Sequence, residues 1–300
     1  MSLHKGKDDL DSGGRIGFTH KKENPSNRWK LIIINIALGL VIVIIALTVK
    51  AVVLDRKPDK NQGKNLTDPV AATAAPVDTP AAVEVPEPQG AEKWLRKDLD
   101  PNKPMVALTF DDGPYSKVTR KILKTLKKTD SRATFFVVGN RVEDFAETLK
   151  MTYDQGNQIA SHTYDHADLS KMSAKQIKKE IDKTNKEVSK VIGCDTTALR
   201  PPYGNVSQKM RKTVPVPMFY WSLDSEDWKS RNVDSILKKC KSVEDGDIIL
   251  MHDLYPTTAK AAEKLVPKLV KKGFQLVTID ELMYYKGIKG KAGKVYYSGR

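Results

Sequence analysis

The sequence contains little cysteine and little histidine. Its 2 cysteines, Cys194 and Cys240, form no CxxC pair, so a disulfide framework is excluded while a single bridge between them stays open. Three of the 5 histidines lie beyond residue 100, at His162, His166 and His252. A site in that part of the chain that needs imidazole groups must be built from these three.

The sequence also lacks internal repeats and recognisable nucleic-acid-binding motifs. Lysine and arginine number 51 against 37 aspartates and glutamates, which gives a formal net charge of +14. Such a charge suits a polyanionic environment, whether nucleic acid, anionic lipid or an anionic cell wall. Because the lysines are spread along the chain, we expect most of them to be solvated surface residues, and we expect no nucleic-acid partner.

The first 91 residues divide into three segments by composition. Residues 1–30 are polar and basic without apolar periodicity, which predicts a disordered cytoplasmic tail. Leu31–Val49 carries no charge and the apolar character resumes up to Leu54, so residues 31–54 predict a transmembrane signal anchor rather than a buried core helix. Residues 55–91 hold six prolines among many Ala, Thr and Val residues, which predicts a disordered linker.

A cleaved signal peptide is the alternative for residues 31–54. Its apolar region would be shorter, and no clear small-x-small cleavage site follows, which favours an uncleaved anchor. Lysine and arginine are balanced on the two sides of the segment, so the positive-inside rule does not set its orientation. A short tail, one early anchor and a large following domain predict a single-pass cell-membrane protein whose large domain is extracellular, in the cell-wall space.

Residues 92–300 have the composition of a globular domain. Short apolar runs predict strands at Met105–Phe110, Thr134–Val138, Gln158–Ser161, Phe219–Leu223, Asp247–Met251 and Gln275–Ile279. Amphipathic segments predict helices at Lys117–Lys128, Val142–Gln155, Ala174–Ile192, Val233–Cys240 and Thr258–Lys272, with helix C-caps near Gly156, Gly193 and Gly273. The alternation predicts an α/β fold with a mainly parallel sheet or barrel, in which sites gather at the C-terminal ends of strands.

Two adjacent carboxylates, Asp111 and Asp112, follow the strand that ends at Phe110, and Gly113-Pro114 then turns the chain. Burying adjacent charges is costly unless other groups pair with them or bind them. A metal ion bound to one carboxylate and a proton-transfer role for the other would account for that cost.

Two histidines, His162 and His166, follow the strand that ends at Ser161. Their i, i+4 spacing lets both imidazoles face one ion if the segment turns helically, although two surface histidines would have the same spacing. One aspartate with two histidines is a usual open ligand set for Zn²⁺ or a similar divalent ion. The fourth position would hold a water whose pKa the metal lowers toward about 7.

Three further places carry candidate functional groups. His252 ends a strand and is placed to act as a general acid, or else as a core histidine with one backbone hydrogen bond. The rigid turn Arg200-Pro201-Pro202-Tyr203-Gly204 lets Arg200 pair a carboxylate and lets a backbone amide face an oxyanion, or is simply a loop. In Trp221–Trp228, Asp227 could orient a histidine and Trp228 could wall a pocket; alternatively both tryptophans are core residues and the acids are exposed.

Taken together, these segments resemble the polysaccharide deacetylase family, carbohydrate esterases with the NodB homology domain. The resemblance covers roughly residues 100–285, and no motif residue is missing. It rests on five motifs that follow one another in the family's order: Thr109-Phe110-Asp111-Asp112-Gly113-Pro114, His162-Thr163-Tyr164-Asp165-His166, Arg200-Pro201-Pro202-Tyr203, Asp224-Ser225-Glu226-Asp227-Trp228 and Leu250-Met251-His252.

The resemblance implies a distorted (β/α) barrel with fewer than eight strands and a divalent metal bound by three side chains, Asp112, His162 and His166. It implies that Asp111 is the catalytic base and that Arg200 tunes it. Arg132, just before the predicted second strand, is a further candidate partner for Asp111. The metal is expected to be Zn²⁺, with Co²⁺ or Ni²⁺ as alternatives.

The resemblance also implies further catalytic and substrate-binding roles. His252 would be the catalytic acid, and Asp227 would orient it. The backbone amide of Tyr203 would help to hold the oxyanion. The remaining substrate-binding residues would be Trp228 and Leu250, which line the pocket for the acetyl methyl group, and Pro201.

These observations predict a catalytic domain at residues 92–300 that hydrolyses the N-acetyl group of N-acetylglucosamine in a cell-wall polysaccharide, with peptidoglycan as the expected substrate and acetate as a product. The expected partners are that glycan and the membrane, and the catalytic domain is expected to be monomeric. The alternative enzyme is an O-acetyl esterase acting on xylan-like or other acetylated glycans. An inactive glycan-binding module is a third interpretation, against which the intact metal and acid–base positions argue.

Overall fold

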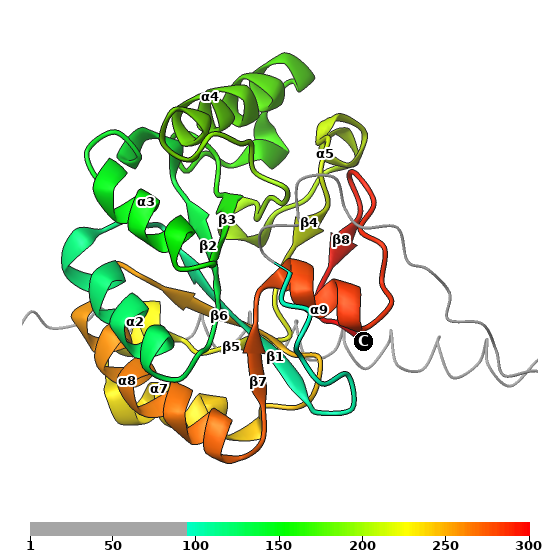
Figure 1. The fold of residues 1–300 in the computed structure, drawn as a ribbon. Coiled ribbons are helices and arrows are strands. Elements are labelled where there is room, and N and C mark those ends of the chain that lie inside the picture. The colour runs from blue at the N-terminus through cyan, green and yellow to red at the C-terminus, as the bar shows by residue number, and fades with distance from the viewer. Residues whose placement is uncertain (1–94) are drawn as a thin grey trace, which may run out of the picture. The chain divides into compact units, whose positions relative to one another are not determined.

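The computed structural model describes residues 95–300 (Figure 1). The predicted tail at 1–30, the predicted anchor at 31–54 and the predicted linker at 55–91 lie outside the described residues. Within residues 95–300, none of the helices has both the length and the apolar character needed to cross a membrane.

A parallel sheet forms the centre of the described domain (Figure 1). Its path is β3-β2-β1-β6-β5, and β7 pairs with the first half of β1. These strands are β1 (Met105–Asp111), β2 (Thr134–Val137), β3 (Gln158–Ser161), β5 (Leu223–Asp224), β6 (Ile248–His252) and β7 (Gln275–Val277). The predicted α/β class with a mainly parallel sheet is confirmed.

Short bridges link the two edges of this sheet. Ser161 at the β3 edge pairs with Leu199, and Leu199 pairs with Met218 in β4 (Met218–Phe219). From β4, residues 220–222 lead directly into β5 at the opposite edge. β4 also pairs with β8 (Val295–Tyr296) in a separate sheet of two strands. The sheet therefore curls back toward its own first edge.

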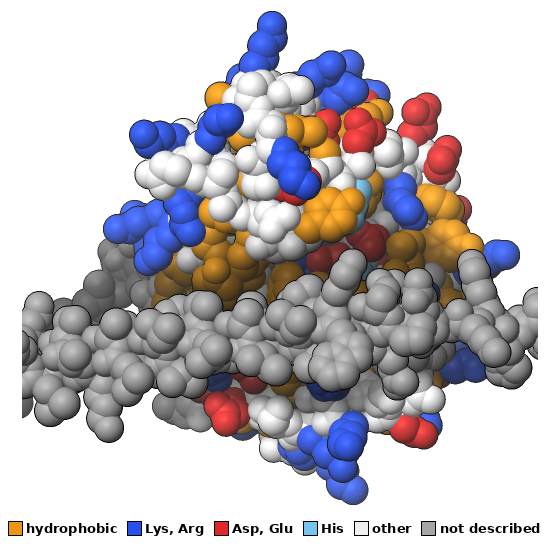
Figure 2. Space-filling view, turned by 180° about the vertical axis from the view of Figure 1, so that it is seen from behind, with side chains coloured by type: hydrophobic (Ala, Val, Ile, Leu, Met, Phe, Trp, Pro, Cys, Tyr) orange, Lys and Arg blue, Asp and Glu red, His pale blue; other side chains and the backbone are white. Residues whose placement is uncertain are grey.

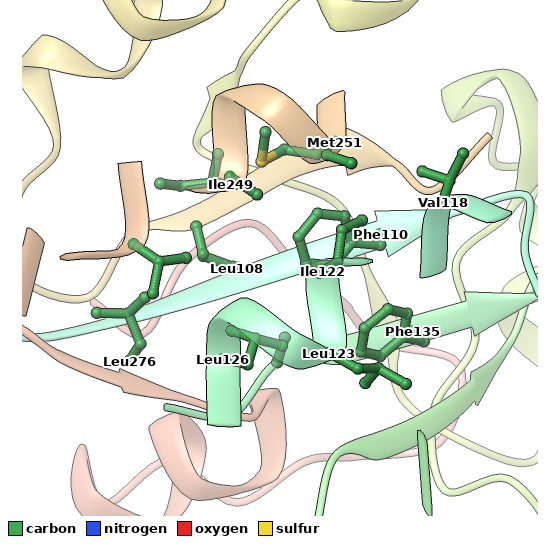
Figure 3. Packing of buried hydrophobic residues seen from close by; sticks show 14 of the residues in the cluster. Leu108, Phe110, Val118, Ile122, Leu123, Leu126, Phe135, Ile249, Met251 and Leu276 are labelled. Carbon is green, nitrogen blue, oxygen red and sulfur yellow. The ribbon is translucent and has the colours of Figure 1, made fainter. Parts of the chain in front are cut away.

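Side-chain alternation along the strands divides the core into two clusters. Leu108 and Phe110 of β1, with Ile249 and Met251 of β6, pack against the helices, as Figure 3 shows. Met105 and Ala107 of β1 face the other way, into a second cluster shared with residues of the neighbouring strands: Phe136, Ala160, Phe219, Ile248 and Val277. By the same alternation, Asp111 lies on the inward face of the curled sheet.

Helices cover the outer face of the sheet (Figure 1). α7, α8, α2, α3 and α4 contact one another in that order. The helices are α2 (Ser116–Lys128), α3 (Ala146–Asp154), α4 (Ala174–Ile192), α5 (Gln208–Thr213), α6 (Asp227–Ser230), α7 (Val233–Lys239), α8 (Pro256–Lys271) and α9 (Ile279–Tyr285), with 3₁₀ turns at Gly139–Arg141, Leu169–Lys171, Pro202–Gly204 and Cys240–Ser242. Gly156, Gly193 and Gly273 adopt positive φ at the ends of α3, α4 and α8, as predicted.

Several predicted boundaries are wrong. The predicted strand at 219–223 is split between β4 and β5, and the predicted strand at 275–279 ends at Val277 because Thr278 caps α9 with a capping box. The predicted helix from Val142 begins only at Ala146. The short elements α5, α6, α9 and β8 were not predicted. Cys194 and Cys240 are both free, so the bridge left open by the sequence is not formed.

Candidate active site

The C-terminal ends of the parallel strands bring distant carboxylates and histidines together. In the register of β1 with β6, Asp111 lies directly beside His252. His162 follows β3, which lies two strands away from β1 on the side opposite β6. The candidate residues therefore gather at the C-terminal end of the sheet, as expected for parallel strands.

Asp111 is 3% exposed and pairs with the buried side chain of Arg200. One Arg200 nitrogen donates to Asp111 Oδ1 at 2.7 Å. Burial raises the pKa of Asp111, and the positive charge and hydrogen bond of Arg200 oppose that rise. Within residues 95–300, the other oxygen, Oδ2, accepts no hydrogen bond and has His162 Nε2 at 3.8 Å. Asp111 thus keeps an oxygen available on the pocket side.

The buried Arg200 guanidinium is satisfied by the strands around it. It donates to Thr109 Oγ1 at 2.7 Å and to the carbonyls of Phe219 and Tyr220 at 3.0 and 2.8 Å, and it lies 4.1 Å from the centre of the Phe136 ring. A buried cation whose three nitrogens all donate hydrogen bonds holds its carboxylate partner in one position. The predicted pairing of Arg200 with Asp111 is confirmed.

Asp112 and the two histidines form a possible metal site. Each offers one ligand atom, and these atoms lie within 4.8 Å of one another. Asp112 Oδ1 is 3.3 Å from His166 Nε2 and 3.6 Å from His162 Nε2. His162 Nδ1 lies 2.7 Å from the Arg200 carbonyl, to which it donates, so its Nε2 faces the other ligands. The donor set of two nitrogens and one oxygen fits a divalent ion with an open position.

The backbone around these ligands is bent rather than helical. Asp112, Thr163 and His166 adopt positive φ values of 74°, 68° and 55°. The helical turn that would bring the two histidines to one face is absent from this segment, and left-handed bends turn both rings toward Asp112 instead. Non-glycine residues rarely adopt this conformation, which is typical of functional sites. Burial lowers the pKa of His162 to about 3 despite the charge of Asp112, so the ring is neutral, as a metal ligand must be.

His252 is held by Asp227. Its Nδ1 lies 2.8 Å from Asp227 Oδ1, and its backbone N–H donates to Oδ2 at 2.8 Å. Burial lowers the pKa of His252, but the hydrogen bond and charge of Asp227, with the charges of Asp111 and Asp112, more than offset this and raise it to about 9. The ring is therefore protonated at neutral pH, and the predicted orientation by Asp227 is confirmed.

The pocket around these groups has a volume of about 540 Å³. Its lining includes every predicted metal ligand, the predicted base and acid, and the four predicted substrate-binding residues Pro201, Tyr203, Trp228 and Leu250. Tyr203 is 68% exposed and Trp228 47%, whereas Leu250 is buried. Figure 2 views this face, where red carboxylates and a pale blue histidine lie in a depression among hydrophobic side chains.

Four groups near the site were missed in the sequence. Thr109 Oγ1 accepts a hydrogen bond from Arg200, and Thr258 Oγ1 donates one to Asp227 Oδ2 at 2.6 Å. Trp221 and Tyr255 line the pocket. The two threonines act through other side chains and carry no signal of their own in a single sequence. Tyr255 comes three residues after the end of β6, at the same end of the sheet as the site, so its place near the pocket could have been predicted.

Arg132 does not pair with Asp111. Its guanidinium lies 3.5 Å from Glu281, near the start of β2 and therefore at the opposite end of the sheet. Strand direction explains the error, because a residue that precedes a parallel strand lies far from one that ends its neighbour.

A third carboxylate, Asp253, lies behind the Asp111-Asp112 pair. It is buried, accepts from Thr119 Oγ1 at 2.5 Å, and its backbone N–H donates to the Asp111 carbonyl at 3.2 Å. A Cβ on Gly113 would overlap with the Asp253 carboxylate, so the glycine of this turn is required by close packing. Burial raises the pKa of Asp253 to about 7.

Comparison with known proteins agrees with this geometry. The family model for polysaccharide deacetylase matches residues 98–215. The chain is 40% identical over 185 residues to the peptidoglycan-N-acetylmuramic acid deacetylase PdaC of Bacillus subtilis, covering 61% of this chain and 40% of that protein. It is also 40% identical over 219 residues to the peptidoglycan-N-acetylglucosamine deacetylase PgdA of Listeria monocytogenes, covering 73% of this chain and 44% of that protein.

A solved structure extends the match to a complete domain. The family 4 acetyl xylan esterase of Clostridium thermocellum, in complex with a cobalt ion, is 33% identical with a TM-score of 0.62, and the match covers 65% of this chain and 98% of that one. By contrast, the chain spans less than half the length of the two peptidoglycan deacetylases.

Proposed function

Because the chain belongs to the polysaccharide deacetylase family, we propose that it hydrolyses the N-acetyl group of N-acetylglucosamine residues in peptidoglycan and releases acetate. The relatives named as peptidoglycan deacetylases support this substrate class. The reaction needs a base for water, a site for the oxyanion and an acid for the leaving amine.

The observation that carries the proposal is the division between the two adjacent aspartates. Asp112 lies with two histidine nitrogens, whereas Asp111 is turned to Arg200 and keeps one oxygen free of hydrogen bonds from residues 95–300. A purely structural pair of carboxylates would instead be satisfied by donors on all its oxygens.

Asp112, His162 and His166 would hold the divalent ion, with Zn²⁺ preferred and Co²⁺ or Ni²⁺ accepted by the same donors. A metal bound there supplies Lewis-acid polarisation of the acetyl carbonyl and of the attacking water. The neutral state of His162 and its hydrogen bond to the Arg200 carbonyl prepare the ring to be a ligand.

The chain's own residues then move the protons. Asp111 Oδ2 takes a proton from water, and Arg200 keeps the carboxylate in place and limits its pKa. His252 gives the proton on its Nε2 to the amine nitrogen as the C–N bond breaks, because Asp227 holds the Nδ1 side of the ring. The two groups lie side by side in the register of β1 and β6, which puts base and acid on one pocket wall.

The pocket walls position the acetyl group. Leu250 and Trp228 offer apolar surface to the methyl group, and Pro201 and Tyr203 also line the pocket. Tyr203 has a positive φ of 63°, which turns the peptide of this residue at the pocket edge. We assign its backbone amide to the oxyanion.

An O-acetyl esterase is the second candidate, favoured by the similarity to an acetyl xylan esterase. Ester hydrolysis needs the same base and metal but places less demand on His252, because an alkoxide can leave without protonation far more readily than an amide anion. Acetate release from N-acetylglucosamine oligomers and from acetylated xylan, measured with the same full-length preparation, separates the two. No release from the first substrate would overturn N-deacetylation.

The location of the activity belongs to the same proposal. A membrane anchor at residues 31–54 and a Pro-rich linker at 55–91 would carry an extracellular, monomeric catalytic domain into the cell wall. Protease added outside intact cells should remove the domain if this orientation is correct.

A further inference from the structure

Arg231 lies at the mouth of the pocket. Its guanidinium carbon is 3.2 Å from the centre of the Tyr255 ring, and its Nε donates to the Trp228 carbonyl at 2.8 Å. Tyr255 and Trp228 both line the pocket. An arginine stacked on an aromatic ring keeps its remaining N–H groups in the ring-parallel plane, where they match a carboxylate. Two contacts therefore fix an exposed cation beside the substrate pocket.

A second arginine acts on the same tyrosine. Arg141 ends the 3₁₀ turn after β2, and that turn binds the metal-ligand loop because the Gly139 and Asn140 N–H groups donate to the Thr163 and Tyr164 carbonyls. Burial raises the pKa of Tyr255, and the positive charges of Arg231 and Arg141 both oppose that rise. Arg141 thus follows a turn that is fixed to the metal-ligand loop, and its charge reaches Tyr255.

The charges of the pocket and its mouth differ in sign. The lining carries the carboxylates Asp111, Asp112 and Asp224 and, within residues 95–300, neither lysine nor arginine. Over the same residues, Arg141 and Arg231 form no ion pair, whereas Glu226 beside Trp228 is paired with Lys239. Within these residues neither arginine is neutralised by a carboxylate, and Arg231 can meet an anion that approaches the mouth while a neutral acetamido group enters the pocket.

We propose that Arg231, together with Arg141, binds a carboxylate carried by the glycan, on the sugar in the pocket or on the next one. The inference rests on the proposed function and narrows its substrate to anionic glycan. The lactyl ether of muramic acid carries such a carboxylate where no stem peptide is attached to it, whereas chitin-like oligomers and xylan backbones carry none. The site would thereby distinguish peptide-free muramic acid units from neutral acetylated polymers by charge.

The test compares two forms of one substrate. The full-length chain is assayed for acetate release on peptide-free peptidoglycan oligomers with free lactyl carboxylates and on the same oligomers after methyl esterification. We expect kcat/KM for the carboxylate form to exceed that for the ester, and the ratio to fall about fivefold in Arg231→Gln and further in the double variant with Arg141→Gln. The ratio is independent of the folded fraction, because both substrates meet the same preparation.

Arg120→Gln is the matched control, since Arg120 is a surface arginine of α2 paired with Glu147. It should keep the wild-type ratio. A wild-type ratio near one, or a ratio that Arg231→Gln and Arg141→Gln leave unchanged, would overturn this inference alone. Absence of acetate from both forms would overturn the proposed deacetylation together with it.

Discussion

The two ends of the sheet bury carboxylates in different ways. At the closed end, formed by Arg96, Arg132 and Glu281, Glu281 is fully buried and accepts from three donor groups of Arg96 and from the Thr278 N–H. At the open end, formed by Asp111, Asp112 and Asp227, Asp111 Oδ2 receives no donor from residues 95–300, and Asp112 faces two histidines.

The difference separates carboxylates that stabilise from carboxylates that react. A buried charge whose oxygens are all bonded resists change in protonation, and its loss is felt in the free energy of unfolding. A buried charge with an unbonded oxygen on a cavity can accept a proton or an ion. Substitutions at the two ends should therefore affect different quantities.

Metal removal should give the largest effect, confined to the open end. Dialysis of the full-length chain against a chelator should reduce acetate release to the blank level, because the three ligands then hold no ion. Added Zn²⁺ should restore it. The far-UV circular dichroism spectrum should be retained, since the closed end contains no ligand. Full activity in metal-free protein would contradict the claim that the carboxylate and histidines of the open end hold a catalytic ion.

Asp227→Asn should reduce the rate about 100-fold and change the pH profile. The acid must be protonated, and Asp227 helps to raise the pKa of His252 to about 9, so activity should fall as pH rises through that value. Without the charge, burial dominates and the pKa falls, so the alkaline limb of kcat/KM should move to lower pH.

A pH–rate series on Asp227→Asn and on Asp182→Asn measures this shift. Asp182 is an exposed aspartate of α4 near Lys178, which makes it the matched control. An alkaline limb that stays in place in Asp227→Asn would exclude the assigned partnership with His252.

Glu281→Ala should instead lower the free energy of unfolding by about 3 kcal/mol, because it removes the buried carboxylate that pairs with partly buried Arg96 and with Arg132. Urea unfolding of the full-length chain measures it. The kcat of the folded fraction should equal that of the wild type. A large loss of kcat without loss of stability would mean that the closed end takes part in the reaction.

Thr258→Val should give the smallest effect of the series. It removes one donor to Asp227 Oδ2, while the backbone N–H of His252 still bonds to the same oxygen. We expect a loss of about 1 kcal/mol in stability and a decrease of about fivefold in kcat. A loss as large as that of Asp227→Asn would show that the hydroxyl, rather than the histidine, fixes the carboxylate.

Much of the open end could be predicted from the sequence. Asp111, Asp112, His162 and His166 stand beside strand ends, and parallel strands bring such positions to one edge. His252 was predicted for the same reason, whereas Arg200 was predicted because the rigid turn after it fixes its position. α2, α4 and α8 were predicted because their apolar periodicity is long and Gly193 and Gly273 mark two of their ends.

The rest depends on contacts that a single sequence does not reveal. β4 and β5 are two residues each and take their shape from bridges to Leu199 and β6, so local propensity did not separate them. α9 is a short helix that begins with a capping box made by Thr278 and Glu281. The sequence predicted a strand through Thr278 instead. Arg132 was predicted at the wrong end of the sheet. It precedes the start of β2, whereas Asp111 ends β1.

The central claim is the division of labour between adjacent aspartates, and metal content measured beside acetate release tests it most directly. The full-length Asp112→Ala variant should lose both the metal and the activity. Asp111→Asn should keep the wild-type metal content and lose about 1,000-fold in kcat, because only the base is removed. Equal loss of metal in the two variants, or full activity in Asp111→Asn, would contradict the account.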